Sequence, residues 1–330
     1  MNNKIRWGVL GTGKIARQFA AGLKHLSDAT LMAVGSRSAD SANAFGEQFA
    51  VAHRHASYEG LVSDPDVDVI YVATPHGCHQ ENTLLALTAG KAVLCEKPFT
   101  INAREAEQAI AFARTKKLFL MEAMWTRCFP LMENLRGLLA AKTIGEVRML
   151  TADFGFRAEH HEEERLFSPA AGGGALLDVG VYPVSLASMI FGAPTRIVSQ
   201  AQLGQTGVDE EAAIILSHAQ GQLAVLSTAI RLETPQEAII MGTAGRIRIH
   251  SPWWRPAAMT LSREGRSDEL MEFPFAGNGY QFEATEVMDC LRTGKLESRL
   301  MPLDETLSIM RTLDAIRAQW GLKYPIDQRV

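Results

Sequence analysis

The chain has 330 residues, a length that favours two domains over one. Apolar residues make up 47% of it and charged residues 21%, the balance of an ordinary globular protein. The net charge of -4 argues against a nucleic acid or an anionic membrane as partner, because no basic excess is present to neutralise phosphates. We expect no membrane span, since no apolar run approaches the ~20 residues that a span needs.

The cysteines and the start of the chain predict the compartment. The four cysteines show neither paired nor metal-type spacing, which indicates reduced thiols. The first predicted strand begins at Ile5 and leaves no room for a signal peptide before it. The expected localisation is cytoplasmic.

The first predicted element is an apolar strand over residues 5–10, followed by a glycine-rich turn and a helical pattern to about residue 23. Strand, turn and helix in this order form the dinucleotide-binding fingerprint. Gly11 makes the tight turn, Gly13 lets the backbone reach a pyrophosphate, and the N–H groups at the helix start bind the anion. The predicted cofactor-binding residues here are Gly11, Thr12, Gly13, Lys14 and Ile15.

The second predicted strand, residues 30–34, ends in a segment that bears on the choice of cofactor. A site for NAD would place an acidic residue here to hold the ribose 2′-hydroxyl. This chain has Ser36, Arg37 and Ser38 instead, and a guanidinium with hydroxyls suits a 2′-phosphate. The sequence therefore favours NADP (NADPH) over NAD. The alternative is that Arg37 only begins a solvated loop.

A helix over residues 39–49, a short strand near 53–56, a helix near 58–63 and a buried strand over 67–73 follow. The last of these strands ends in Thr74, Pro75, His76 and, after two residues, His79. We expect this segment to lie against the cofactor, with His79 beginning the next helix. A metal pair of the two histidines is less favoured, because no third ligand is evident nearby, and no metal site is predicted.

The apolar run over residues 92–95 has the length of a buried strand and ends in Glu96, Lys97 and Pro98. Catalytic side chains project beyond the carboxyl ends of such strands, so Glu96 and Lys97 are candidate site residues. An exposed turn is the alternative for an isolated Glu-Lys-Pro. With a helix to about residue 116 and a strand over 118–122, the alternation predicts a doubly wound parallel sheet, a Rossmann domain over residues 1–123.

After residue 123 strands dominate, and their hairpin spacing predicts an α+β domain over residues 124–330 with a large, mostly antiparallel open sheet. We expect this domain to bind substrate and to mediate oligomerisation, with a catalytic cleft between the two domains. The last helix, about 303–320, is expected to pack back on the first domain. The run of histidines and glutamates at 160–164 is interpreted as an exposed loop rather than a metal site. The predicted strands cover residues 147–156, 196–203, 211–217, 223–232, 237–241, 246–250, 258–263 and 269–273, and the other helices cover 131–140, 181–191 and 280–293.

Three motifs together, Gly11-Thr12-Gly13, Glu96-Lys97-Pro98 and the string over residues 178–182, resemble the glucose-fructose oxidoreductase and inositol dehydrogenase (Gfo/Idh/MocA) family. The resemblance covers nearly the whole chain. The longer strings over 122–127, 153–155 and 173–182 are similar to its branch of dimeric dihydrodiol dehydrogenases, also described as NADP-dependent D-xylose dehydrogenases.

The resemblance implies a Rossmann domain, NADP(H), and Lys97 as the catalytic or substrate-polarising residue. It also implies that Trp125 and Phe154 form an apolar wall of the substrate pocket and that Asp178 binds a substrate hydroxyl. Many family members have His where this chain has Tyr182, a departure that agrees with the dihydrodiol branch.

The chemistry of alcohol oxidation supports the same residues. The hydroxyl proton needs an acceptor while the hydride leaves to the nicotinamide. A tyrosine ionises near pH ~10, and an ammonium within a few ångströms favours its phenolate. Lys97 and Tyr182 are therefore predicted to work as a pair, and which of them takes the proton is left open. A helix-start aromatic in the core is the alternative for Tyr182. A cis Lys97–Pro98 peptide is also predicted.

The leading hypothesis is an NADP-dependent oxidoreductase acting on the CH–OH group of a trans-dihydrodiol or an aldose such as D-xylose. The alternatives are another sugar or cyclitol oxidoreductase of the family and a non-catalytic dinucleotide-binding sensor. Lys97, Asp178 and Tyr182 together argue against the sensor, which needs no proton-transfer set. We also predict a homodimer through the open sheet face, with Trp253 and Trp254, beside Pro252 and Pro256, as interface residues.

Overall fold

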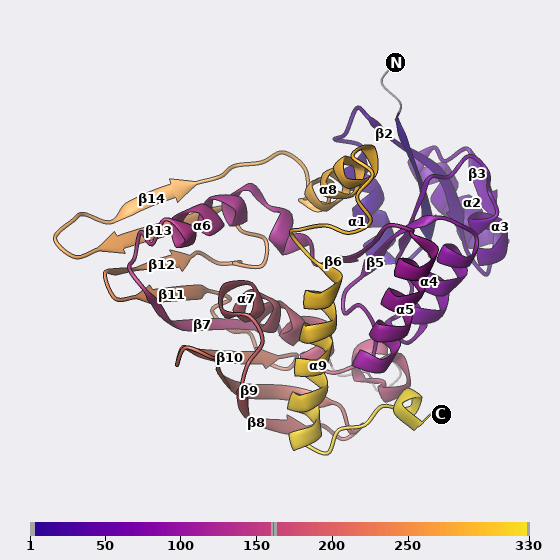
Figure 1. Ribbon diagram of the computed structural model, residues 1–330. Helices are drawn as coiled ribbons and strands as arrows, with labels where there is room; N and C mark the ends of the chain where they lie inside the picture. Colours follow the sequence, from indigo (N-terminus) through magenta and orange to yellow (C-terminus); the bar gives the residue numbers. More distant parts are fainter. Residues whose placement is uncertain (1–3, 160, 162–163, 329–330) are drawn as a thin grey trace. The chain divides into compact units, whose positions relative to one another are not determined.

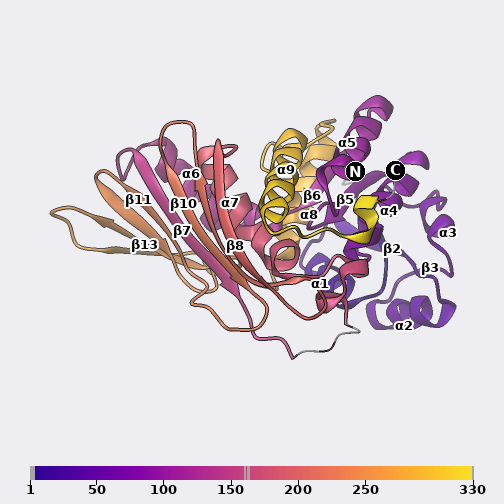
Figure 2. The same cartoon turned by 90° about the horizontal axis from the view of Figure 1, so that it is seen from below.

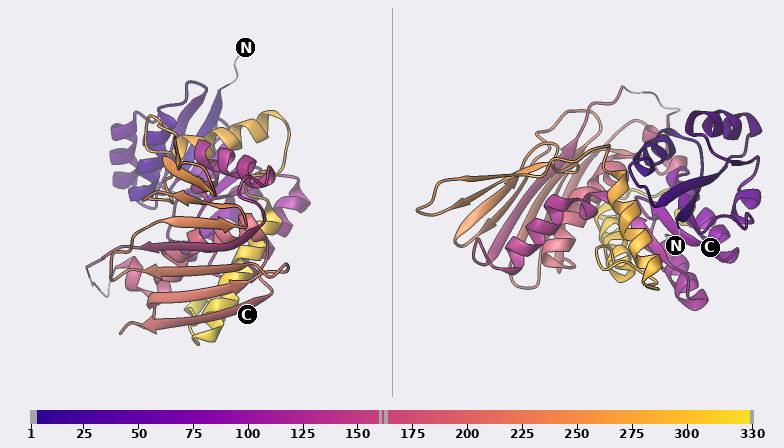
Figure 3. Two further views of the ribbon diagram at one scale, coloured as in Figure 1. Left: turned by 90° about the vertical axis from the view of Figure 1, so that its left-hand side faces the viewer. Right: turned by 90° about the horizontal axis from the view of Figure 1, so that it is seen from above.

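The computed structural model describes residues 4–159, 161 and 164–328 (Figures 1, 2 and 3). The chain forms two compact units that do not follow its linear order. Unit 1 comprises Met1–Thr100, Arg104–Trp125 and Ala276–Thr306. Unit 2 comprises Ile101–Ala103, Thr126–Phe275 and Leu307–Val330. The linear division at residue 123 did not foresee that Ala276–Thr306 returns to unit 1.

Unit 1 contains a six-stranded parallel sheet in the order β3-β2-β1-β4-β5-β6. The central strands are apolar runs buried on both faces, as a parallel sheet covered by helices requires. This confirms the predicted doubly wound sheet. The strands are β1 (Ile5–Leu10), β2 (Ala29–Gly35), β3 (His53–His55), β4 (Val69–Val72), β5 (Ala92–Glu96) and β6 (Leu120–Ala123).

The helices of unit 1 pack by apolar stripes. On α1, Ala16, Phe19, Ala20 and Leu23 are buried, the spacing of one helical face. Helix α8 packs against α1 so closely that a Cβ on Gly22 would lie 2.8 Å from the Tyr280 Cβ. The helices are α1 (Lys14–Leu23), α2 (Ala39–Phe49), α3 (Tyr58–Val62), η1 (His76–Cys78), α4 (His79–Thr88), α5 (Ala103–Lys116) and α8 (Tyr280–Arg292). The short helix η2 (Trp125–Cys128) begins at the last residue of one segment of unit 1 and continues in unit 2.

Unit 2 contains an eight-stranded sheet in the order β14-β13-β12-β11-β7-β10-β9-β8 (Figure 3). Every pair of neighbours is antiparallel except β7 and β10, which run parallel. The mostly antiparallel sheet is therefore confirmed. Its strands are β7 (Val147–Gly155), β8 (Arg196–Leu203), β9 (Asp209–Ser217), β10 (Leu223–Ala229), β11 (Ala238–Gly242), β12 (Gly245–Ile249), β13 (Ala258–Arg263) and β14 (Glu269–Glu272).

One face of this sheet is covered and carries the core of unit 2. Helix α7 (Val181–Phe191) packs against β7 and β10 (Figure 2), where Leu150, Ala152 and Leu226 are buried. The remaining helical elements are α6 (Pro130–Ala140), η3 (Arg165–Phe167), η4 (Pro169–Ala171), η5 (Leu176–Gly180), α9 (Leu303–Gln319) and η6 (Pro325–Gln328).

Helix α9 begins in unit 1 and continues in unit 2. Thr306 in its first turn donates a hydrogen bond to Glu122 of β6 at 3.0 Å. Gln319 at its other end accepts from the Ser199 amide and donates to the Ile197 carbonyl, both on β8 and both at 2.9 Å. The sequence predicted only that this helix packs back on the first domain, and not that most of it belongs to unit 2.

A single helical stretch among the described residues, Pro169–Phe191, has the length and composition of a membrane span, with mean hydropathy 1.6. Such a run was not expected from the sequence. Because 72% of its most apolar window is buried inside the structure, the same stretch also has the surroundings of a core helix, and it is weak evidence for a span.

Candidate functional site

The turn after β1 has the geometry that the fingerprint requires. Gly11 has φ +108°, and a Cβ on it would lie 2.9 Å from the Ala73 carbonyl oxygen at the end of β4. The Gly11 amide donates to the Gly35 carbonyl at the end of β2 at 2.9 Å. Only glycine combines this positive φ with so close an approach. The turn is therefore fixed against the carboxyl ends of two neighbouring strands.

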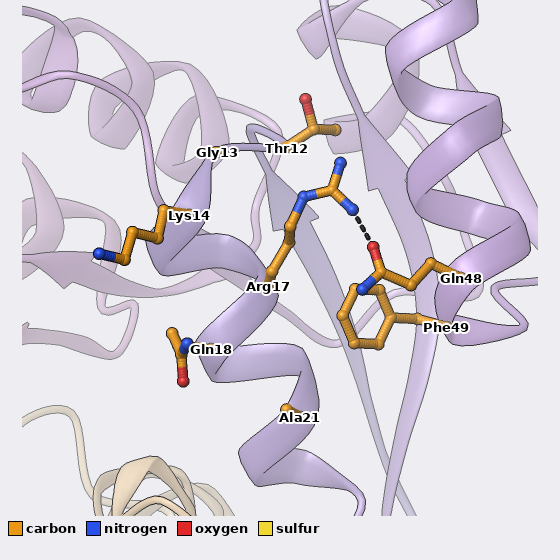
Figure 4. A pocket seen from close by; sticks show the side chains of 8 residues that line it. All are labelled: Thr12, Gly13, Lys14, Arg17, Gln18, Ala21, Gln48 and Phe49. Carbon is orange, nitrogen blue, oxygen red and sulfur yellow. Dashed lines mark hydrogen bonds between the residues drawn. The ribbon is translucent and has the colours of Figure 1, made fainter.

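The start of α1 is open to an anion. Gly13 is its N-cap and supplies no side-chain cap, and a Cβ there would meet none of the described residues within 4 Å. The first N–H groups of a helix have no partner within the helix and favour negative charge. An opening of about 540 Å³ adjoins this turn, and Figure 4 shows its lining side chains. Arg17 there hydrogen-bonds Gln48 of α2 (Figure 4). The lining residues are Thr12, Gly13, Lys14, Arg17, Gln18, Ala21, Gln48 and Phe49.

Both serine hydroxyls of the segment after β2 accept hydrogen bonds from backbone amides. The Ser38 hydroxyl accepts from the Ser41 amide at 3.3 Å and caps α2. The Ser36 hydroxyl accepts from the Ser38 amide at 3.3 Å. Tyr58 lies near the exposed Arg37: burial raises the pKa of the Tyr58 hydroxyl, and the Arg37 guanidinium opposes this rise. Tyr58 was not predicted, because 21 positions separate it from Arg37 in the sequence.

The segment after β4 is tied to the segment after β5. His79 is fully buried, with Nδ1 2.8 Å from the Pro98 carbonyl oxygen and Nε2 2.9 Å from the Thr74 carbonyl oxygen. Asn82 donates to the Thr74 hydroxyl at 3.1 Å. Both ring nitrogens of His79 thus face backbone carbonyls, and this side chain holds the turns rather than projecting from them. His76 is also largely buried and begins η1.

The Lys97–Pro98 peptide is cis, as predicted. The buried Glu96 carboxylate accepts from the Tyr71 hydroxyl and from the Lys97 amide, the latter at 3.1 Å. The acid of the Glu-Lys-Pro motif therefore anchors the backbone on which the lysine stands. Lys97 itself is half-buried at the carboxyl end of β5.

A second carboxyl lies next to Glu96 without having been predicted. Glu283 of α8 is 0% exposed, and its oxygens have no hydrogen-bond partner among the described residues. Burial, and then the neighbouring Glu96, raise the pKa of Glu283 well above its ordinary value. Burial also raises the pKa of Tyr71, whose ring stacks on Phe19 with centroids 3.8 Å apart. At neutral pH we therefore expect Glu283 to carry a proton.

The predicted pocket aromatics have different neighbours in the two units. In unit 1, Trp125 stacks on Tyr280 with centroids 4.5 Å apart. In unit 2, the Phe154 ring lies 5.2 Å from Tyr182 and stacks on Trp254 at 4.9 Å. Tyr182 is the second residue of α7 and is 7% exposed. Tyr280 and Trp254 belong to these clusters but were not predicted as site residues.

The assignment of the tryptophan pair to an exposed interface was wrong for Trp253. Its side chain is 0% exposed and its indole N–H donates to the Asp153 carbonyl at 2.6 Å. The Trp254 indole N–H donates to the Gln236 side chain at 2.9 Å, beside Phe154. Large aromatic residues in a connection can be core residues as readily as interface residues, and only the packing decides.

Asp178 lies in η5, ahead of α7, and is paired with Arg165 at 2.9 Å. Its side chain is 13% exposed. The ion pair with Arg165 therefore holds the Asp178 carboxylate just ahead of α7. Arg165 was not predicted, because it lies in a stretch without periodicity. In the 160–164 run, His161 is 3.5 Å from Glu159, while His160, Glu162 and Glu163 lie outside the described residues.

The glycine-rich segment before Asp178 is anchored by a buried aspartate. Asp209 accepts from the Leu176 amide at 2.6 Å, and burial raises the pKa of Asp209 to about 7. Gly174 has φ +107°, and a Cβ there would collide with the other Asp209 oxygen. The Tyr324 hydroxyl donates to the Gly173 carbonyl at 2.8 Å. Asp209 therefore fixes the start of the segment that carries Asp178.

Sequence comparisons agree with this architecture. Residues 5–124 match the oxidoreductase family with an NAD-binding Rossmann fold, and residues 132–248 match the GFO/IDH/MocA C-terminal domain. Trans-1,2-dihydrobenzene-1,2-diol dehydrogenase of Mus musculus is 38% identical, over 98% of this chain and 99% of the relative. The Homo sapiens protein of the same name is 36% identical over the same shares.

Solved structures show the same fold. An aldose-aldose oxidoreductase from Caulobacter crescentus, complexed with glycerol, superposes with TM-score 0.88 and 25% identity, over 96% of this chain and 98% of that one. KijD10, a 3-ketoreductase from Actinomadura kijaniata in complex with NADP and TDP-benzene, superposes with TM-score 0.86 and 28% identity over the same shares. The chain belongs to the Gfo/Idh/MocA family of oxidoreductases, as its motifs predicted.

Proposed function

We propose that this protein is an NADP-dependent dehydrogenase that transfers a hydride between the nicotinamide and a secondary alcohol or carbonyl of a trans-dihydrodiol or an aldose such as D-xylose. The observation that carries the proposal is the full-length similarity, at 36–38% identity, to relatives named trans-1,2-dihydrobenzene-1,2-diol dehydrogenase. The aldose is included because an aldose-aldose oxidoreductase shares the fold along 98% of its own length.

The cofactor site is proposed to hold NADP rather than NAD. The open start of α1 fits a pyrophosphate, and the tightly packed Gly11, with its positive φ, shapes the turn beneath it. Arg37, which lies near Tyr58, supplies a cation for a 2′-phosphate. When bound, the nicotinamide accepts or supplies the hydride. The proposed binding residues are Gly11, Thr12, Gly13, Lys14, Ile15, Ser36, Arg37, Ser38, Thr74, Pro75, His76, Glu96 and Lys97, with His79 positioning the last of these.

The proposed catalytic residues divide the proton chemistry. During oxidation the substrate O–H bond breaks, and its proton passes to the Tyr182 phenolate oxygen or to the Lys97 amine. A positive Lys97 favours the phenolate form of a tyrosine that shares its site. Asp178 accepts a hydrogen bond from a substrate hydroxyl, and the rings of Trp125 and Phe154 supply apolar contacts.

Unit 1 is proposed as the cofactor domain, and unit 2 as the substrate and dimerisation domain. On the sheet face opposite α7, three exposed apolar residues lie in register across neighbouring strands. They are Val198 on β8, Ile215 on β9 and Val225 on β10, and they are 49%, 44% and 37% exposed. An apolar row on an uncovered sheet supports the proposed homodimer. The proposed localisation is cytoplasmic.

The proposal is tested by following NADP reduction by absorbance with a panel of trans-dihydrodiols, D-xylose, D-glucose and inositol. We expect turnover with a diol or an aldose, and a loss of about 10²–10⁴-fold in Lys97→Met and Tyr182→Phe. Both variants should still bind NADPH. Lys295→Met, which removes an exposed lysine of unit 1, is the matched control and should keep full activity.

The outcomes separate the candidate functions. Turnover confined to inositol or D-glucose would replace the proposed substrate with another sugar or cyclitol. Tight NADPH binding without turnover on the whole panel would refute the dehydrogenase proposal in favour of a sensor. Equal affinity for NADH and NADPH, unchanged in Arg37→Ala, would refute the proposed cofactor preference.

A further inference from the structure

Two histidines of the edge strand β3 converge on one buried carboxylate. His53 and His55 are two positions apart, so their side chains share a face of the strand. His53 Nδ1 lies 2.7 Å from Asp64 Oδ2, and His55 Nε2 lies 2.9 Å from the same oxygen. One ligand atom from each of the three residues lies within 4.8 Å of the other two. All three residues belong to unit 1.

We propose that His53, His55 and Asp64 bind a divalent transition-metal ion of the zinc class. Imidazole nitrogen and carboxylate oxygen are ligands that Zn²⁺ accepts, and three protein ligands leave a coordination position for water. The proposal is independent of the substrate and of the cofactor. It also departs from the sequence prediction of no metal site, which considered the four cysteines, His76 with His79, and the 160–164 run.

The surrounding structure holds the donors in place before any ion arrives. Asp64 Oδ1 accepts from the Asp66 amide at 2.9 Å, which directs Oδ2 toward the two rings. Gly60 leaves space for the neighbouring imidazole, because a Cβ there would lie only 3.3 Å from His55 Nδ1. Hydrogen bonds of this kind, which orient the ligands, commonly support metal affinity.

Charge and access also suit a cation. The Asp64 side chain is 3% exposed, whereas those of His53 and His55 are 38% and 26% exposed, so an ion reaches the nitrogens from solvent. The buried carboxylate of Asp64 supplies an oxygen ligand, and the two partly exposed imidazoles supply nitrogen ligands.

The further charges near the site are mixed but leave a negative surplus. Asp66 and Asp68 interact with Arg6 at 2.9 and 2.8 Å. The Lys91 ammonium donates to the backbone carbonyls of Asp64 and Val67, at 2.6 and 2.8 Å. The three carboxylates of Asp64, Asp66 and Asp68 thus outnumber the two cations, Arg6 and Lys91.

The competing interpretation is a structural clasp, in which the two imidazoles only donate hydrogen bonds to Asp64. The two interpretations differ in what the rings bind, because a metal ion must displace the hydrogens that point at the carboxylate. An ion would cross-link β3 to the segment after α3. β3 in turn supports the segment after β2, because the Ser36 amide donates to the His55 carbonyl at 3.1 Å.

The test uses the full chain without a histidine tag, saturated with NADPH. ZnCl₂ is titrated by calorimetry, CoCl₂ by visible absorption, and MgCl₂ serves as the hard-cation comparison. We expect one Zn²⁺ per chain, the ligand-field bands of nitrogen-ligated Co²⁺, and no uptake of Mg²⁺, which prefers oxygen ligands. Zn²⁺ should also raise the melting temperature, because it binds the folded state.

His53→Gln and His55→Gln should each weaken Zn²⁺ binding at least about tenfold and abolish the rise in melting temperature. His161→Gln is the matched control, since it removes a different imidazole paired with a carboxylate, and should bind as the natural chain does. Absence of Zn²⁺ binding by the natural chain would overturn the proposal in favour of the clasp. Unchanged binding in the double variant His53→Gln/His55→Gln would overturn it by placing the ion elsewhere. If either variant fails to fold, the test is made on the natural chain, in which proton NMR should show the shifted signals of two imidazoles that ligate Co²⁺. Signals from fewer than two such imidazoles would refute the site.

Discussion

Asp209→Asn should make the protein more stable at neutral and alkaline pH. Burial raises the pKa of Asp209 from an ordinary 3.8 to about 7, so the folded state binds this proton more tightly than the unfolded state does. The free energy of unfolding must then fall as pH rises from about 4 to about 7, because over this range only the folded state keeps the proton. At 1.36 kcal/mol for each pKa unit, the fall amounts to about 4 kcal/mol. Asparagine has no proton to lose, so the variant lacks this component.

The assay is urea denaturation of the natural chain and of Asp209→Asn between pH 4 and pH 8, followed by circular dichroism. The two should be similar near pH 4, and the variant should gain about 4 kcal/mol relative to the natural chain by pH 8. Asp268→Asn, which neutralises an exposed carboxyl of the same unit, is the control and should leave the two curves parallel. If stability depends on pH in the same way in Asp209→Asn and in the natural chain, the reasoning is refuted. Asp209, which accepts from the Leu176 amide, would then have the same pKa in the folded and unfolded states.

Three further substitutions test other parts of the structure. Gly13→Ala should fold normally, since its Cβ meets none of the described residues within 4 Å, but should bind NADPH more weakly. Gly11→Ala should in addition lower the melting temperature through strain at φ +108°. NADPH binding is followed by cofactor fluorescence and stability by thermal melting, and equal melting temperatures of the two variants would refute this distinction. Ile215→Lys places a charge in the exposed apolar row and should shift sedimentation from dimer to monomer, an unchanged dimer locating the interface elsewhere. Because the pKa of Glu283 is raised in the folded state, this residue lowers the free energy of unfolding once the pH exceeds its pKa in the unfolded state. Glu283→Gln should therefore raise the urea midpoint more at pH 8 than at pH 5. An equal change at the two pH values would show that Glu283 is ionised in the folded state.

The strands and helices of unit 1 could be predicted because local patterns determine them. β4 and β5 are uninterrupted apolar runs, as strands buried on both faces must be, and the periodicity of α1 marks its buried side. The placement of Ala276–Thr306 could not be predicted, because helical periodicity reveals a buried face but not the element that buries it. The parallel pairing of β7 with β10 escaped prediction for the same reason, since strand alternation is identical in both pairings.

The residues of the candidate site also fall into two groups, those that the sequence predicted and those that only the fold reveals. Motifs singled out Lys97, Asp178 and Tyr182 as proposed catalytic residues, because each stands in a string with a fixed spacing. Glu283 and Asp209 carry no such signal: a glutamate on a helix and an aspartate at a strand end are ordinary surface residues until packing buries them. The pair His53 and His55 did have a local signal, since alternate histidines on a strand share a face, but Asp64 completes the cluster only through the fold.

Buried carboxylates anchor the backbone of both segments that carry the proposed catalytic groups. Glu96 accepts from the Lys97 amide and Asp209 from the Leu176 amide, while Glu122, which is 0% exposed, accepts from the Phe99 amide at 3.2 Å. A side-chain acceptor fixes an amide that neither helix nor sheet can satisfy, and inside a protein such a bond is strong. Such a bond is stronger to a charged carboxylate than to a neutral carboxyl, so the Asp209 anchor is expected to tighten as pH rises through about 7, while the fold as a whole loses stability. Mutation of a catalytic group alters the chemistry at one position, whereas neutralising an anchor is expected to alter where that group stands.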